Sequence, residues 1–134
     1  MTDTSLKIYI VEPDPIFSLV LYRVLYEIKG VSPTDISMFE DGDAFLKNYK
    51  YQNEYSIYII NDILPKQSGT KLIQEIRKQD EEGIIYIMTK SNTNQELIFA
   101  IGLGADNYFI KSFDLDVFKA IIERKVQRRH TKWN

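Results

Sequence analysis

The sequence predicts an α/β fold: a doubly wound, five-stranded parallel sheet with five helices on its two faces. Short apolar runs alternate five times with segments of helical period. Parallel neighbours in a sheet need crossover connections, which the helical segments supply. Two of the runs, SIYII (56–60) and IIYIMT (84–89), are apolar at nearly every position. Such runs are typical of central strands that are buried on both faces.

The first strand is LKIYIV (6–11), which is rich in β-branched and aromatic residues. The segment IFSLVLYRVLYEIKG (16–30) follows it, with apolar residues at helical spacing and a stop at the final glycine. A short second strand, DISMF (35–39), precedes a helix in DGDAFLKNYK (41–50). Asp41 is the expected N-cap of that helix.

The third strand leads into a helix in TKLIQEIRKQ (70–79), whose apolar residues share one face. The fourth strand leads into a helix in TNQELIFAIGLG (93–104), which ends in glycines. A fifth strand, NYFI (107–110), precedes a helix in DLDVFKAIIERKVQ. We expect Asp114 to cap this last helix, which completes the alternation.

Length and composition indicate one cytoplasmic globular domain. The chain has 134 residues, 44% of them hydrophobic and 27% charged, which is the range of globular domains. No apolar run reaches the roughly 18 residues that a membrane span needs, and MTDTS at the start lacks the regions of a signal peptide. The chain has no cysteine and one histidine, which argues against disulfides, thiolate catalysis and zinc. A net charge of −2 gives no general electrostatic reason to bind nucleic acid.

The last stretch, RKVQRRHTKWN, is basic and loses its apolar period after Val126. We predict a domain over residues 1–126 and a basic C-terminal tail over 127–134, which is either the frayed end of the last helix or the start of a linker. His130 and the basic residues around it are expected to be solvated, rather than catalytic or bound to nucleic acid. Trp133 has no role that the sequence assigns.

Polar residues follow the predicted strands at the edge where the chemistry of open parallel sheets is found. These strand ends carry Glu12, Pro13, Asp14, Asn61, Asp62, Thr89, Lys90, Lys111 and Ser112.

Four segments together resemble the receiver domains of two-component response regulators, over about residues 5–126: IYIVEPDP, INDILPKQSG, IMT and GADNYFIKSF. The resemblance implies a flavodoxin-like sheet with strand order 2-1-3-4-5. It also implies an acidic Mg²⁺ pocket with an Asp phospho-acceptor, a switch pair formed by a hydroxyl and an aromatic residue, and a lysine of the conserved type. It further implies a partner protein, such as a histidine kinase, an output domain or another signalling protein. A homodimer through the fourth helix, fifth strand and fifth helix would suit the family.

The acceptor of the family lies four residues before the loop Pro and eight before the Gly that opens the third helix. Counting back from Pro65 and from Gly69, both offsets give Asn61. An amide cannot become an aspartyl phosphate. Asp62 is one residue late, and because side chains alternate along an extended segment, it is expected to point away from the pocket that Asn61 enters.

The rest of the acidic pocket is also reduced. The resemblance assigns Glu12 to the first acid, but Pro13 replaces the second and offers neither a carboxylate nor an N–H. Asp14 lies at the predicted start of a helix and is expected to be an N-cap. Lys90 stands where the family has a small residue. We therefore expect no cofactor, and no Mg²⁺ in particular.

The switch residues of the family are retained as Thr89 and Tyr108, and the conserved-type lysine as Lys111. Each also has a purely structural interpretation: Thr89 ends a strand, Tyr108 packs as a half-buried aromatic residue, and Lys111 pairs with Glu12. Ser112 replaces the Pro that the family usually has after the lysine.

We therefore predict a non-enzymatic, atypical receiver that works by phosphorylation-independent protein contact, by oligomerisation or by a signal bound near the altered pocket. One alternative is a phosphorylatable receiver that uses Asp62 or Asp14 as acceptor with Mg²⁺, or an Asn61 that has been deamidated. Another is a docking module in which Thr89 and Tyr108 keep one arrangement whatever the partner.

Overall fold

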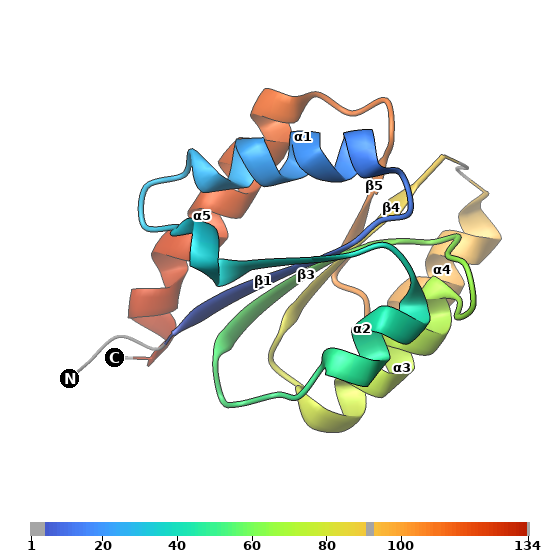
Figure 1. The fold of residues 1–134 in the computed structure, drawn as a ribbon. Coiled ribbons are helices and arrows are strands. Elements are labelled where there is room, and N and C mark those ends of the chain that lie inside the picture. The colour runs from blue at the N-terminus through green and yellow to red at the C-terminus, as the bar shows by residue number, and fades with distance from the viewer. Residues whose placement is uncertain (1–4, 91–92, 134) are drawn as a thin grey trace.

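The computed structural model describes residues 5–90 and 93–133, with side chains as far as residue 129. Figure 1 shows strands and helices in strict alternation, apart from a 3-10 turn, η1, before the second strand. The elements are β1 (Leu6–Val11), α1 (Pro15–Tyr26), η1 (Pro33–Asp35), β2 (Ile36–Phe39), α2 (Gly42–Asn48), β3 (Tyr55–Asn61), α3 (Gly69–Gln79), β4 (Ile84–Thr89), α4 (Asn94–Leu103), β5 (Asn107–Ile110) and α5 (Leu115–Trp133).

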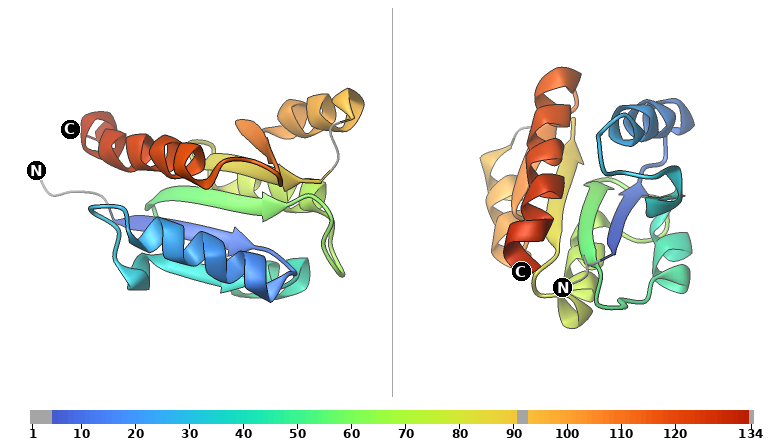
Figure 2. Two further views of the ribbon diagram at one scale, coloured as in Figure 1. Left: turned by 90° about the horizontal axis from the view of Figure 1, so that it is seen from above. Right: turned by 90° about the vertical axis from the view of Figure 1, so that its left-hand side faces the viewer.

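The strands form one parallel sheet in the order β2-β1-β3-β4-β5. Helices α1 and α5 cover one face, and α2, α3 and α4 cover the other (Figures 1 and 2). This arrangement confirms the predicted fold class and strand order. Because the strand order reverses between β1 and β3, the loops after these two strands leave toward opposite faces and open a site between them.

Each face of the sheet has its own apolar layer. Leu21 of α1 and Phe118 of α5 are fully buried on one face, while Phe45 of α2 and Ile73 of α3 are fully buried on the other. All seven residues of β3 are buried, as the continuous apolar run predicts for a central strand. The sheet is therefore held from both sides, which fixes the positions of the strand ends.

The predicted helix caps are present. The Asp14 carboxylate accepts hydrogen bonds from the backbone of Ile16 and Phe17, and the Asp41 carboxylate accepts one from Ala44. The Asp114 carboxylate accepts from the backbone N–H groups of Asp116 and Val117. Asp14 thus acts as an N-cap at an exposed position, as its place in the sequence predicted.

Helix α5 is longer than its apolar period suggests, since it runs to Trp133. The residues beyond Val126 are mostly Arg, Lys and Gln, which favour helix without needing a buried face. The side chains of His130 and Trp133 lie outside the described residues. Among the helices that the structure describes, none combines the length and the apolarity needed to cross a bilayer.

A buried acid marks the amino-terminal side of the sheet. The Tyr58 hydroxyl donates to Asp80 Oδ2 at 2.8 Å and lies 2.7 Å from the Tyr49 hydroxyl. Asp80 Oδ1 accepts from the backbone N–H of Gly83 at 2.8 Å. The polar side-chain groups of Tyr49, Tyr58 and Asp80 are therefore hydrogen-bonded to one another or to the backbone.

Candidate functional site

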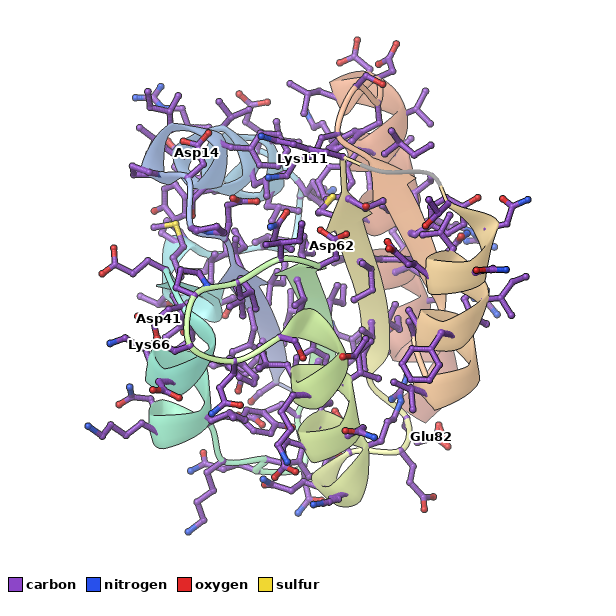
Figure 3. The ribbon with its side chains drawn as sticks, turned by 90° about the vertical axis from the view of Figure 1, so that its right-hand side faces the viewer. Asp14, Asp41, Asp62, Lys66, Glu82 and Lys111 are labelled. Atoms are coloured by element: carbon purple, nitrogen blue, oxygen red, sulfur yellow. The ribbon has the colours of Figure 1, made fainter. Side chains whose placement is uncertain are left out.

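The polar strand ends meet at the carboxyl edge of the sheet. Backbone hydrogen bonds between neighbouring segments continue one residue beyond the ends of β3 and β5. Asp62 N donates to Met88 O at 2.9 Å, and Lys111 N donates to Thr89 O at 2.7 Å. These bonds hold the polar residues at the edge of the sheet. Figure 3 shows Asp62 at this edge, with Lys111 on its α1 side and helix α4 on the other. The site therefore has two sides, one toward α1 and one toward α4.

On the α1 side, Lys111 pairs with the buried carboxylate of Glu12. The Nζ–Oε1 distance is 2.9 Å, and the Glu12 side chain is only 1% exposed. The contact is an ion pair and not a well-directed hydrogen bond. The second oxygen of Glu12 accepts from the Asp14 backbone N–H at 2.9 Å, and Lys111 Nζ lies 4.7 Å from the ring centre of Phe17. Both oxygens of Glu12 are thus engaged within the protein, and the expected Glu12–Lys111 pair is present.

At the end of β3, the Asn61 side chain is buried and acts as a donor. Its Nδ2 donates to the backbone carbonyl of Ile63 at 2.6 Å. An ionised carboxylate is an acceptor only, so it could not make this bond. The amide is therefore part of the loop that it helps to close.

The loop after β3 is packed tightly against α3. The backbone N–H of Gly69 donates to Asp62 O at 3.2 Å. A Cβ at position 69 would lie 2.9 Å from the backbone oxygen of Asn61. This position requires glycine, because no side chain fits between the start of α3 and the end of β3.

The Asp62 side chain contacts the Thr89 hydroxyl. Thr89 Oγ1 donates to Asp62 Oδ2 at 2.7 Å, and Thr89 is buried. The Asp62 side chain makes different contacts from the Asn61 side chain. Its contact with Thr89 was not predicted, because it depends on the register of two strands. Asn61 pairs with Met88, so the next residue of each strand, Asp62 and Thr89, also lie side by side.

The remaining predicted residues surround this arrangement. Tyr108 is half-buried and packs against the apolar layer beneath α2, α3 and α4. It lies opposite Ile87 in the register of β4 and β5. Lys90 is exposed. Tyr108 and Thr89 thus lie on neighbouring strands, with Thr89 at the carboxyl edge of the sheet.

The residues of the acidic pocket do not fit Mg²⁺. Glu12 is occupied by Lys111 and by a backbone N–H, position 13 is Pro, and the amide of Asn61 points a donor at a carbonyl. Within residues 5–90 and 93–133, no group of three Asp, Glu, His or Cys side chains could hold a metal ion. A hard cation needs several oxygen ligands that are free to bind it, and this pocket offers too few.

Comparison with known proteins identifies the family to which the sequence is similar. The family model "Response regulator receiver domain" matches residues 8–123. The transcriptional regulatory protein RprY of Bacteroides fragilis is 28% identical over 132 residues, covering 98% of this chain and 54% of that protein. The probable C4-dicarboxylate response regulator DctR of Bacillus subtilis is 26% identical over 121 residues, covering 90% of this chain and 52% of that protein. The chain therefore spans about half the length of these relatives.

Solved structures agree with this similarity. The crystal structure of a two-component response regulator from Clostridium difficile is 26% identical and covers 92% of this chain and 97% of that one, with a TM-score of 0.75. The family match extends from β1 into α5 and includes every strand end described above. This chain belongs to the response regulator receiver domain family.

Proposed function

We propose that this receiver domain signals by phosphorylation-independent protein contact. The observation that carries the proposal is the hydrogen bond from Asn61 Nδ2 to Ile63 O, at the position of the phospho-acceptor. An amide is a poor nucleophile, and here its nitrogen is committed to the loop. The engaged Glu12 and the absence of an acid at position 13 support the same conclusion, since the pocket does not attract the Mg²⁺ that phosphorylation would need.

The Asp62 carboxylate lies within hydrogen-bond distance of the Thr89 hydroxyl, the expected switch residue. In the resemblance described above, the Thr and the aromatic residue respond to an incoming phosphoryl group. In this chain the Asp62 carboxylate already accepts from Thr89 at 2.7 Å. Charge-assisted bonds of this kind are stronger than neutral ones. We infer that Asp62 holds Thr89 in one arrangement without any modification.

The face of α4, β5 and α5 supports protein contact. Two large apolar residues of α4 that do not line its contact with α3 are exposed, Ile98 by 68% and Ile101 by 46%. Val117 near the start of α5 is 55% exposed. Exposed apolar residues in a group are typical of protein interaction sites. The proposed partner is a histidine kinase, an output domain, another signalling protein or a second copy of this chain.

The proposal extends to the organisation of the chain. Receiver domains are signalling modules, and we expect no enzymatic activity from this one. Residues 1–126 would form the receiver unit, and the basic residues 127–134 would lead to a neighbouring region. A cytoplasmic location belongs to the same proposal. Nucleic-acid binding is not expected from the receiver unit, because the whole chain, basic tail included, has a net charge of only −2.

The test is intact-mass spectrometry after incubation with Mg²⁺ and acetyl phosphate. We expect no added phosphoryl mass on the wild type. We also expect little on Asn61→Asp, because Pro13 remains where the second acid would stand. The double variant Pro13→Asp with Asn61→Asp should gain a phosphoryl group, and beryllofluoride should then shift its spectra.

A modified wild type would contradict the proposal. Peptide mapping would then identify the acceptor. Asp62 is the favoured rival, since its carboxylate already contacts the switch hydroxyl. Mapping to Asp14 would require this N-cap to leave the first turn of α1. Mapping to position 61 would indicate deamidation of Asn61.

A further inference from the structure

A pocket lies between α3 and α4, on the α4 side of the site. Its volume is about 270 Å³. The wall is mostly apolar and includes Ile73 of α3, Ile87 of β4, and Leu97 and Ala100 of α4. Because Ile73 and Ile87 are buried in the packed core, this part of the wall is firmly held. The pocket is thus built on regular elements and not on a loose loop.

The charged residues that line this pocket are acidic, and Thr70 is a neutral polar residue beside them. Asp62 and Glu96 both line the pocket, and no Lys, Arg or His is among the described residues that do. Asp62 Oδ2 accepts from Thr89, but no donor of the described residues reaches the other oxygen, Oδ1. A carboxylate in a partly apolar site gains more from a cation than it would in water. The charge of the lining therefore favours a cationic occupant.

The size of the pocket favours a small molecule. Its volume is just below the roughly 300 Å³ at which pockets for drug-sized ligands begin. We propose that this pocket binds a small organic cation, with an ammonium group at Asp62 and Glu96 and an apolar body against Ile73, Ile87 and Leu97. The proposal concerns a different cavity from the Glu12 pocket and does not depend on how position 61 behaves.

A cation bound in this pocket would affect the hydrogen bond between Asp62 and Thr89. Asp62 both lines the pocket and accepts the hydrogen bond of the Thr89 hydroxyl. A cation bound to Asp62 therefore competes with Thr89 for the charge of the same carboxylate. A ligand that entered only the apolar part would leave this bond alone. The resonances of Thr89 therefore report whether the charged end lies where we place it.

The experiment uses 2-phenylethylamine as the cationic probe, with 2-phenylethanol and 3-phenylpropionate as neutral and anionic probes of similar shape. Titration of the isotope-labelled chain is followed by amide and methyl spectra. We expect saturable shifts at Ala100, Ile87 and Thr89 with the amine, at least tenfold weaker binding of the alcohol, and no binding of the acid.

Three variants locate the charge. Asp62→Asn and Glu96→Gln should each weaken the binding of 2-phenylethylamine by about five- to tenfold. Glu82→Gln makes the same chemical change at the far end of the molecule (Figure 3) and should leave binding unchanged. Glu96 is exposed on α4, so its substitution tests the site without risk to the fold. Equal affinity for the amine and the alcohol, or equal losses in Glu96→Gln and Glu82→Gln, would overturn the proposal.

Discussion

At the scale of single residues, the bond between Asp62 and Thr89 can be measured by a double-mutant cycle. Asp62→Ala and Thr89→Val each remove one partner, and the double variant removes both. We expect a coupling energy of about 1–2 kcal/mol, because the bond is charge-assisted but only partly buried. Urea unfolding of the four proteins gives this energy. A coupling near zero would show that Asp62 does not hold the hydroxyl in solution.

Sequence reasoning assigned Asn61 to the acceptor position by resemblance but did not anticipate the contact of Asp62. Asn61 follows from counting positions back from Pro65 and Gly69, which needs only the chain. The contact of Asp62 with Thr89 depends on which residues of β3 and β4 face one another. That register is set by packing across the sheet, and the sequence of either strand alone does not contain it.

At the scale of elements, the junction between β3 and α3 can be tested with two glycines. Gly69→Ala places a methyl group 2.9 Å from a backbone oxygen, so we expect a loss of about 2 kcal/mol in the free energy of unfolding. Gly102→Ala is the matched control in α4, where a Cβ would meet nothing within 4 Å. There we expect a gain of about 0.5–1 kcal/mol, since alanine favours helix over glycine.

Urea denaturation of both variants checks this pair. Equal effects at the two positions would mean that the start of α3 can move away from the end of β3 at little cost. The amide signals of Asn61 and Asp62 should shift in Gly69→Ala and stay in place in Gly102→Ala.

The elements themselves were largely predictable, because each has its own period. Strands β3 and β4 follow from their continuous apolar runs, and the helix caps follow from residue type. The full length of α5 was not predictable from apolar period, since its last turns are polar. Its continuation comes from helix propensity, which a search for buried faces does not detect.

At the scale of the whole molecule, the buried tyrosines make the fold sensitive to alkali. Burial raises the pKa of Tyr49 to about 12. Burial, with a smaller contribution from Asp106, raises the pKa of Tyr86 to about 12. Burial also raises the pKa of Tyr58, which is bonded to Tyr49 and Asp80. In the unfolded chain these hydroxyls ionise near pH ~10.

The folded state therefore holds protons that the unfolded state loses. The stabilising effect is complete below pH ~10 and falls as pH rises toward the folded values. We expect the urea midpoint to fall with pH above this point, and less steeply in Tyr49→Phe. Ultraviolet titration should find a group of tyrosines that ionises only on unfolding. If all nine tyrosines titrated together in a protein that stayed folded, this expectation would be wrong.

The hydrogen bond from Asn61 to the Ile63 carbonyl also has a consequence for how the sequence can change over generations. One nucleotide separates an Asn codon from an Asp codon, so an acceptor carboxylate at position 61 needs only one change. The new carboxylate would turn an acceptor toward the carbonyl that the amide now serves at 2.6 Å, beside the carboxylate of Asp62. We expect an intermediate genotype of this kind to lose a contact and to gain no phosphorylation, because position 13 is still Pro. We therefore expect the single change to Asp to be disfavoured unless position 13 changes as well.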